Sequence, residues 1–335
     1  MQDTIKHSLE ELKKHSGKIV ITTHHKPDGD AMGSSLGLYQ YFKNAGIEAQ
    51  VITPTDYAPF LYWLPGNDTV IIYEDHKVQS NEAIANASFI FCLDFNALSR
   101  INEMGKEVKA SNAKIVLIDH HQDPDDFDHE RFIEIGASST CELIYRYIQR
   151  HLDVKLLNDL VGQCIYTGLI TDTGSFRFSS TTSTTIRIAA DLMDLGVRPD
   201  KIYRALFDQN RIERLQLLGY LLSNNLEILE EGKVALGYLS LADIERYNIL
   251  TGDTEGFVNY GLGIAGVELS VLIIDRGPLV KMSFRSKENF PCNVFSAEQF
   301  NGGGHKNAAG GASHEGLEQT IARFKEVIRQ YQVYL

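Results

Sequence analysis

Long apolar runs and closely spaced cysteines are both missing from this sequence. No apolar run approaches the roughly 18 residues that a membrane-spanning helix requires, and the polar N-terminus has no apolar stretch typical of a secretory signal. The four cysteines form no Cys-x-x-Cys pair, as is usual for buried thiols in a reducing compartment. We therefore expect a cytoplasmic protein with no membrane partner. The cysteines are Cys92, Cys141, Cys164 and Cys292.

Positive charge is also scarce. The chain has 32 Lys and Arg against 44 Asp and Glu, which gives a formal net charge of −12. A long nucleic-acid duplex prefers a basic partner, so the composition argues against binding to long duplex DNA. A bound metal and a few arginines can still attract a small anion locally. The charge therefore favours short or small anionic substrates.

The 335 residues, 43% of them hydrophobic, are enough for two folded domains. Residues 1–18 predict an amphipathic polar helix, and short apolar strands alternate with helical segments after it. This alternation predicts an α/β fold with a doubly wound, mostly parallel sheet. The strands are expected at 18–23, 48–54, 69–74, 87–94 and 113–119, and the helices at 34–46, 141–152, 159–171 and 181–196.

The second half of the chain predicts a smaller α+β domain. A continuously helical pattern near residues 191–225 is interpreted as a linker between a first domain at 1–190 and a second at 226–335. Glu231-Gly232-Lys233 predicts the turn of a hairpin, and two further strands follow. A glycine-rich loop at 301–313 then leads into a terminal helix.

Acidic and histidine side chains stand where apolar segments of the first domain end. In open α/β sheets, ligands bind outside the carboxyl ends of the strands. Four separate segments thus carry Asp and His toward one rim of the predicted sheet. These residues are His24, Asp28, Asp30, Asp94, Asp119, His120, His121 and Asp172.

These residue types together indicate a divalent metal site. An isolated Asp-x-Asp is usually a turn or a helix cap. An isolated His-His pair is usually at the surface, or buried in the core with its hydrogen bonds satisfied. Several carboxylates converging without a cation would repel one another, whereas divalent ions remove that cost. The spacing of Asp28 and Asp30 suits two ions about 3.5–4 Å apart, bridged by a third carboxylate. Nitrogen and oxygen ligands without thiolate favour Mn²⁺ over Zn²⁺, with Mg²⁺, Co²⁺ or iron as alternatives.

Five segments in order resemble the motifs of the DHH phosphoesterase family. HHKPDGDAMGS, LDFNALSR, LIDHH and GLITDTGSFRF are similar to its four catalytic motifs. NGGGHKNAAG, preceded by KMSFRS, is similar to its C-terminal DHH-associated substrate domain. The chain most resembles the branch of bifunctional oligoribonucleases and pAp phosphatases (nanoRNases), whose relatives are also called exopolyphosphatase-related.

The resemblance implies a role for each residue at the rim. His24 and Asp28 would hold one ion, whereas Asp30, His120 and Asp172 would hold the other, with Asp94 bridging them. The catalytic group would be Asp94 together with His121, which would face the scissile phosphate, and Asp119, which would support the imidazoles. His25 duplicates the first histidine, and the four-residue offset to Asp28 is what favours His24 as the ligand.

Recognition of the substrate is expected from the second domain. Arg285 has the planar fork that suits a phosphate, although it is also interpretable as a surface strand residue. Gly302, Gly303 and Gly304 would let the backbone approach an anion, although glycine-rich loops are often plain turns. His305 follows them, and Arg100 is either a phosphate ligand or an ordinary helix residue. The active site is then expected in a cleft between the two domains.

The resulting hypothesis is an enzyme that hydrolyses short oligoribonucleotides to mononucleotides, pAp to AMP, or both. A water activated by two metal ions would attack phosphorus in line. The alternatives are a cyclic-dinucleotide phosphodiesterase, a pyrophosphatase or exopolyphosphatase-like hydrolase, and an inactive nucleotide-binding module. Apolar positions expected to be exposed at 199–224 are either a contact in a homodimer or a packing face between the two domains.

Overall fold

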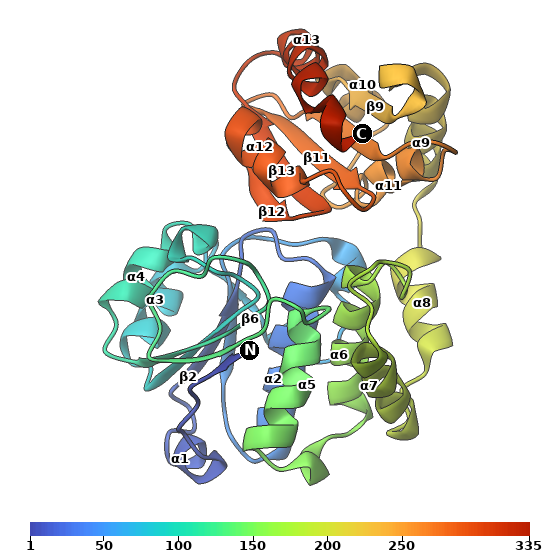
Figure 1. Ribbon diagram of the computed structural model, residues 1–335. Helices are drawn as coiled ribbons and strands as arrows, with labels where there is room; N and C mark the ends of the chain where they lie inside the picture. Colours follow the sequence, from blue (N-terminus) through green and yellow to red (C-terminus); the bar gives the residue numbers. More distant parts are fainter. The chain divides into compact units, whose positions relative to one another are not determined.

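The computed structural model describes all 335 residues and divides into two compact units, Met1–Gln209 and Asn210–Leu335. The first unit, coloured from blue to yellow-green in Figure 1, is built on a seven-stranded sheet with the order β1-β7-β6-β5-β2-β3-β4. Every neighbouring pair is parallel except β1 and β7. The expected doubly wound sheet is therefore confirmed. Its strands are β1 (Gln2–Asp3), β2 (Ile19–Thr23), β3 (Gln50–Thr53), β4 (Ile71–Ile72), β5 (Phe89–Leu93), β6 (Lys114–Asp119) and β7 (Glu130–Ile133).

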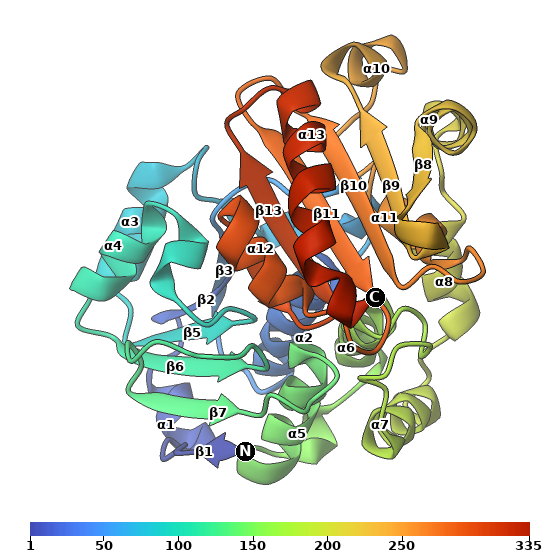
Figure 2. The ribbon, with the colours of Figure 1, turned by 45° about the horizontal axis from the view of Figure 1, so that its top comes forward.

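Both faces of this sheet are buried, because alternate side chains of each strand enter different apolar layers. In β5, Phe89 and Phe91 enter one layer, while Ile90 and Cys92 enter the other. Helices α2, α5 and α6 cover the first face, and α3 and α4 cover the second (Figure 2). The helices of this unit are α1 (Leu9–Lys14), α2 (Gly29–Asn44), α3 (Lys77–Ala85), α4 (Met104–Ala110), α5 (Thr140–His151), α6 (Asp159–Asp172), α7 (Ser183–Asp194) and α8 (Pro199–Phe207), with short 3₁₀ turns η1 (Pro59–Leu61), η2 (Asn67–Thr69), η3 (Leu98–Ile101) and η4 (Val154–Leu156).

The N-terminal helix predicted over residues 1–18 is wrong for its first eight residues. Gln2 and Asp3 form β1, which pairs with the edge of the sheet at β7. The Glu130 carboxylate then accepts hydrogen bonds from the backbone N–H groups of Lys6 and His7 at 3.1 and 3.4 Å. These long-range partners satisfy the backbone without a helix, and α1 begins only after the Ser8 cap.

The second unit contains a six-stranded mixed sheet with the order β12-β13-β11-β10-β9-β8. The predicted hairpin is confirmed, since β8 and β9 pair antiparallel on either side of Glu230–Gly232. Strands β9 and β10 are parallel, and α10 and α11 lie between them in sequence. The strands are β8 (Leu226–Leu229), β9 (Val234–Leu239), β10 (Leu269–Asp275), β11 (Val280–Ser286), β12 (Gly303–His305) and β13 (Ala308–Ser313). The helices are α9 (Ile212–Asn224), α10 (Leu241–Arg246), α11 (Phe257–Leu262), α12 (Cys292–Phe300) and α13 (Leu317–Val327), with 3₁₀ turns η5 (Glu230–Gly232) and η6 (Ile328–Tyr334).

The glycine-rich segment is a hairpin of β12 and β13 rather than the expected loop. A Cβ atom at Gly302 would overlap Ser296 Oγ and the carbonyl oxygen of Gly310. Gly304 has φ +139°, a conformation that other residues rarely adopt. The glycines thus allow close backbone packing within a sheet.

The helical segment predicted across residues 191–225 is interrupted twice. Gly196 adopts φ +99° after α7, and Pro199 then opens α8 as its first residue. A second break, at 208–211, separates α8 from α9, and the two compact units divide there, after Gln209. No helix combines the length and apolar character needed to cross a bilayer.

Candidate metal centre

One group of potential metal ligands consists of His24, Asp28 and Asp94, whose ligand atoms all lie within 4.8 Å of one another. His24 directly follows β2, and its Nε2 lies 3.5 Å from Asp94 Oδ2 and 3.9 Å from Asp28 Oδ2. The ring is oriented by its other nitrogen, Nδ1, which donates to the carbonyl of His25 at 2.8 Å. Asp28 caps α2, where its Oδ1 accepts from the backbone N–H of Asp30 at 3.0 Å. Its second oxygen is thereby directed toward His24.

A second group consists of Asp30, His120 and Asp172. Asp30 lies in the first turn of α2, His120 follows β6, and Asp172 is the last residue of α6. His120 Nε2 is 3.4 Å from Asp172 Oδ2 and 3.8 Å from Asp30 Oδ2. Its Nδ1 donates to the carbonyl of Ala137 at 3.3 Å, which turns Nε2 toward the carboxylates.

Asp94 lies between the two groups. Its Oδ2 is 3.5 Å from His24 Nε2, and its Oδ1 is 3.5 Å from His120 Nε2. The residue is 2% exposed and has φ +65°, which is uncommon outside glycine and costs about 1–3 kcal/mol. The strained backbone immediately after β5 therefore delivers one carboxylate to both groups.

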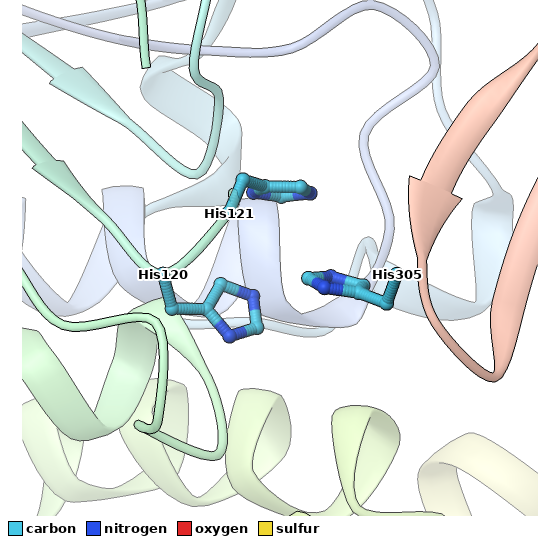
Figure 3. Close-up of side chains that lie close together, drawn as sticks. All are labelled: His120, His121 and His305. Carbon is cyan, nitrogen blue, oxygen red and sulfur yellow. The ribbon is translucent and has the colours of Figure 1, made fainter. Parts of the chain in front are cut away.

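His121 and Asp119 form a supporting pair beside Asp94. His121 Nδ1 donates to Asp119 Oδ1 at 2.7 Å and lies 3.9 Å from Asp94 Oδ1. Asp119 is fully buried at the end of β6. The ring centroids of His120 and His121 are 5.1 Å apart. Figure 3 shows the two side chains next to each other after this strand.

The protonation of the cluster shows how strongly it attracts positive charge. Burial, followed by repulsion from Asp94, raises the pKa of Asp30 to about 8, and burial also raises the pKa of Asp172 well above its usual value. Burial opposes charge on His24 as well, but hydrogen bonding to Asp94 and the negative charges of the nearby carboxylates together outweigh burial and raise the pKa of His24 to about 9. The pKa of His120 is raised for the same reason. Protons thus compensate buried carboxylates, a role that divalent cations also fill.

The residues fit a pair of divalent ions. Each group offers imidazole nitrogen and carboxylate oxygen, and neither contains a thiolate. Ligand atoms bound at about 2.0–2.2 Å from one ion lie roughly 3–3.5 Å apart, close to the separations of 3.4–3.9 Å found here. Asp94, with one oxygen facing each histidine, has the geometry of a bridging carboxylate.

Sequence reasoning missed Thr140, which holds two of these carboxylates. Its backbone N–H donates to Asp30 Oδ2 at 2.6 Å, and its hydroxyl donates to Asp94 Oδ1 at 2.9 Å. The N–H of Cys141 donates to the other oxygen of Asp30 at 2.9 Å. These groups belong to the first turn of α5, where backbone N–H groups lack helical partners. The run Ser138-Ser139-Thr140 is a sequence signal for such a helix start.

Close packing of α2 against α6 joins Asp30 and Asp172. A Cβ atom at Gly33 would lie 2.5 Å from the carbonyl oxygen of Cys164, and one at Gly168 would lie 2.6 Å from Asp30 Oδ1. Gly29, Gly33 and Gly37 are spaced by four residues and face the same helix. This glycine stripe lets the two helices approach closely enough for their carboxylates to meet.

Arg100 lies in the 3₁₀ turn η3, near His25 rather than in an α-helix. Its carbonyl accepts hydrogen bonds from both the backbone N–H and Nδ1 of His25, each at 2.8 Å. This duplicate histidine is consequently tied to a loop, while His24 faces the carboxylates. The structure thus gives the backbone of Arg100 a clear partner.

In the second unit, Arg285 and His305 lie in one row of the sheet. Arg285 on β11 pairs with Ala308 on β13, which pairs with His305 on β12. Directly paired residues share a face, so the two side chains project on the same side, roughly 10 Å apart across the small Ala308. Arg285 donates to the carbonyl of Phe284 at 3.0 Å through one of its nitrogens.

The first unit is thus a doubly wound α/β domain whose carboxyl rim carries paired His and Asp groups suited to holding metal ions. Residues 18–169 match the model of the DHH family N-terminal domain, and residues 232–333 match that of the DHHA1 domain. The chain belongs to the DHH family and is a hydrolase of phosphoester bonds. The resemblance inferred from the sequence motifs is therefore confirmed.

The family assignment extends over nearly the whole chain. A bifunctional oligoribonuclease and PAP phosphatase of Thermus thermophilus is 31% identical, over 96% of this chain and 92% of that protein. The crystal structure of an exopolyphosphatase-related protein from Bacteroides fragilis is similar with a TM-score of 0.91 and 37% identity, over 96% of this chain and 95% of that one. A cyclic-di-AMP phosphodiesterase of Listeria monocytogenes is 28% identical over 91% of this chain but only 46% of that protein.

Proposed function

We propose that this protein hydrolyses short oligoribonucleotides to mononucleotides and pAp to AMP. The observation that carries the proposal is the position of Asp94, whose two oxygens face the two groups of ligands from a single carboxylate. Supporting it, the oligoribonuclease and PAP phosphatase of Thermus thermophilus matches this chain along almost its full length. The acidic net charge agrees with a small anionic substrate rather than a long duplex.

In this proposal, His24, Asp28 and Asp94 hold one divalent ion, and Asp30, His120, Asp172 and Asp94 hold the other. Bound there, the ions would supply an activated water and neutralise charge on the phosphoryl oxygens. Mn²⁺ is the ion that we propose, with Mg²⁺ and Co²⁺ as alternatives.

The chain's own residues orient this chemistry. The Asp119 carboxylate accepts a hydrogen bond from Nδ1–H of His121 and so fixes the orientation of the ring. With Nδ1 engaged in this way, His121 would direct Nε2 toward the scissile phosphate of the substrate. Thr140 holds the carboxylates of Asp30 and Asp94 at fixed positions, so that the ligands need no reorganisation.

Substrate recognition is assigned to residues of the second unit. Arg285 and His305, in one row of the sheet, would bind a phosphate of the substrate by charge-assisted hydrogen bonds. Gly302, Gly303 and Gly304 would let the backbone approach it. Arg100 of the first unit is a further candidate for phosphate binding.

The test is a substrate series with purified protein and Mn²⁺. RNA of two to five nucleotides, a 24-nucleotide RNA, pAp, pyrophosphate and cyclic di-AMP are offered at equal concentrations. Preferred cleavage of short RNA and pAp supports the proposal, whereas exclusive cleavage of pyrophosphate overturns it. Preference for cyclic di-AMP would instead support a second candidate function, that of a cyclic-dinucleotide phosphodiesterase, to which the similarity with the Listeria protein points.

Two variants test the role of the rim residues. Asp94→Asn keeps the size of the side chain but removes its charge, and should abolish metal-dependent turnover. Asp68→Asn, on an exposed 3₁₀ turn, is the matched control and should retain it. Circular dichroism and the thermal shift produced by Mn²⁺ are recorded for both variants. Near-normal activity and an unchanged Mn²⁺ shift in Asp94→Asn would refute the metal assignment.

A further inference from the structure

A groove outside the metal centre runs between η1 and α8 of the first unit. It encloses about 410 Å³, and its lining includes Phe60, Trp63, Lys201, Arg204 and Ala205. None of these residues belongs to the ligand groups at the rim of the sheet. The volume lies in the range of small-molecule pockets, about 300–1,000 Å³. The groove is therefore large enough for one nucleotide-sized ligand.

The α8 side of the groove is cationic. Lys201, Arg204 and Ala205 are three and four residues apart, so they share one face of the nine-residue helix. Lys201 and Arg204 are exposed, and no carboxylate lies within 4.0 Å of either charge. The small Ala205 leaves space between them and the opposite wall. Two uncompensated cations at one groove are notable in a chain of net charge −12.

The opposite side of the groove is aromatic and firmly held. Phe60 and Trp63 are both half-buried, while Leu61 and Leu64 of the same segment are 0% and 2% exposed and anchor it in the core. The indole Nε1 of Trp63 is buried. The part of the ring that remains accessible is consequently carbon, which offers a flat apolar surface.

Flat apolar carbon beside two cations is complementary to a planar aromatic group that carries negative charge. Nucleotides have this combination, since bases stack on aromatic side chains and phosphates pair with Arg and Lys. We propose that this groove binds a nucleotide unit, with the base against Trp63 and Phe60 and the phosphate at Lys201 and Arg204. The site is additional to the metal centre and does not need bound metal.

Trp63 makes this proposal directly measurable, because it is the chain's single tryptophan. A base stacked on the ring should quench its fluorescence, excited at 295 nm, where the nucleotide absorbs little. The protein is kept in EDTA and titrated with AMP, and with adenosine as the uncharged comparison. We expect saturable quenching by AMP and at least fivefold weaker binding of adenosine. Absence of quenching, or equal binding of the two ligands, would overturn the proposal.

Charge-neutralising variants then test the cationic wall. Arg204→Gln and Lys201→Gln should each raise the dissociation constant for AMP at least threefold. Arg187→Gln on α7 and Lys155→Gln on η4 remove the same charge from other exposed positions. These two substitutions should leave the dissociation constant for AMP unchanged. An equal effect of all four substitutions would mean that only overall charge matters, and would refute a localised site.

The source of the nucleotide unit is distinguished by a short oligoribonucleotide. Binding of a five-nucleotide RNA at least fivefold tighter than AMP would identify a strand of RNA as the ligand, whereas equal binding would identify free mononucleotide. Either result supports the groove as a nucleotide site. Because these titrations contain EDTA, they are independent of hydrolysis. If nucleotides do not quench Trp63 but Mn²⁺-dependent hydrolysis is intact, the groove proposal alone is refuted. If nucleotides quench Trp63 but the protein hydrolyses neither short RNA nor pAp, the proposed catalytic function alone is refuted.

Discussion

The Thr140 hydroxyl donates a hydrogen bond of 2.9 Å to the Asp94 carboxylate, while the backbone N–H of the same residue donates to Asp30 at 2.6 Å. Both carboxylates are buried, at 2% and 0% exposure. A single residue at the start of α5 therefore fixes one carboxylate of the second ligand group and the carboxylate that lies between the groups.

Thr140→Val removes the hydroxyl and keeps the shape of the side chain, so it should weaken metal binding about 10–100-fold. The loss follows because Asp94 would keep its position only through its histidine neighbours. Thr140→Ser, which retains the hydroxyl, should remain close to wild type. Activity measured against Mn²⁺ concentration gives the half-saturating value for each protein. Equal values for the valine variant and wild type would refute a positioning role.

Gly33→Ala should destabilise the first unit, because its Cβ would lie 2.5 Å from the backbone carbonyl of Cys164. Backbone cannot rotate away, so α2 and α6 must separate, at a cost of about 1–3 kcal/mol. The same shift would move Asp30 relative to Asp172 and lower activity. Urea unfolding and turnover at saturating Mn²⁺ measure the two effects.

Gly219→Ala, in the middle of α9, is the matched control. A Cβ atom there meets nothing within 4 Å, so alanine should leave stability unchanged or raise it by about 0.5–1 kcal/mol. Similar destabilisation by both substitutions would contradict the close-packing explanation.

The sequence predicted the parts of the site that follow directly from strand ends. His24, Asp94 and His120 each come immediately after an apolar strand, and parallel strands bring their carboxyl ends to one edge. Thr140 was not predictable in this way, because it acts through its backbone position at a helix start, and its partners are 110 and 46 residues away. The glycine-rich segment at 301–313 was misinterpreted as a loop, because composition indicates small residues but not whether their backbone pairs.

The N-terminal segment was misinterpreted for a related reason. Its local pattern is helical, but a tertiary contact decides its structure. His7 is buried, its Nδ1 lies 2.5 Å from Glu130 Oε2, and its Nε2 lies 2.5 Å from the Tyr147 hydroxyl. These partners lie 123 and 140 residues away in the sequence. Such a contact leaves no trace in the periodicity of the first ten residues.

This contact predicts that the contribution of His7 to the stability of the first unit falls in mild acid. Burial lowers the pKa of His7 below 6.5, although the hydrogen bond to Glu130 and the charge of Glu130 act to raise it. The positive charge of Lys114 lowers the pKa of His7 further, and the negative charge of Glu11 acts to raise it. The unfolded chain therefore takes up a proton at His7 that the folded chain does not, so the contribution of His7 to stability falls as pH decreases below about 6.5. The pKa of Glu130 is lowered too: burial opposes this, but hydrogen bonds from Lys6 and His7 outweigh it. Its contribution is lost in turn below about 4.5.

Urea unfolding at pH 7.5 and pH 5.5 compares wild type with His7→Gln, which has no titrating group at this position. The difference in unfolding free energy between the two proteins should be larger at pH 7.5 than at pH 5.5. Taking the difference removes contributions from the other histidines. A difference independent of pH would show that His7 keeps its ordinary pKa in the folded chain.

Arg285→Gln should raise the KM for pAp about tenfold or more and change kcat much less. A charge-assisted hydrogen bond to a substrate phosphate contributes about 1.5–3 kcal/mol, and 1.4 kcal/mol corresponds to a factor of ten. Arg285 shares its face of the sheet with His305, so the two side chains would reach one ligand from β11 and β12, the strands on either side of β13. Lys281→Gln, four residues earlier on the same face of β11, removes the same charge and should leave KM unchanged. If both variants raise KM equally, the phosphate is attracted by the general field of the strand, and the fork of Arg285 does not bind it.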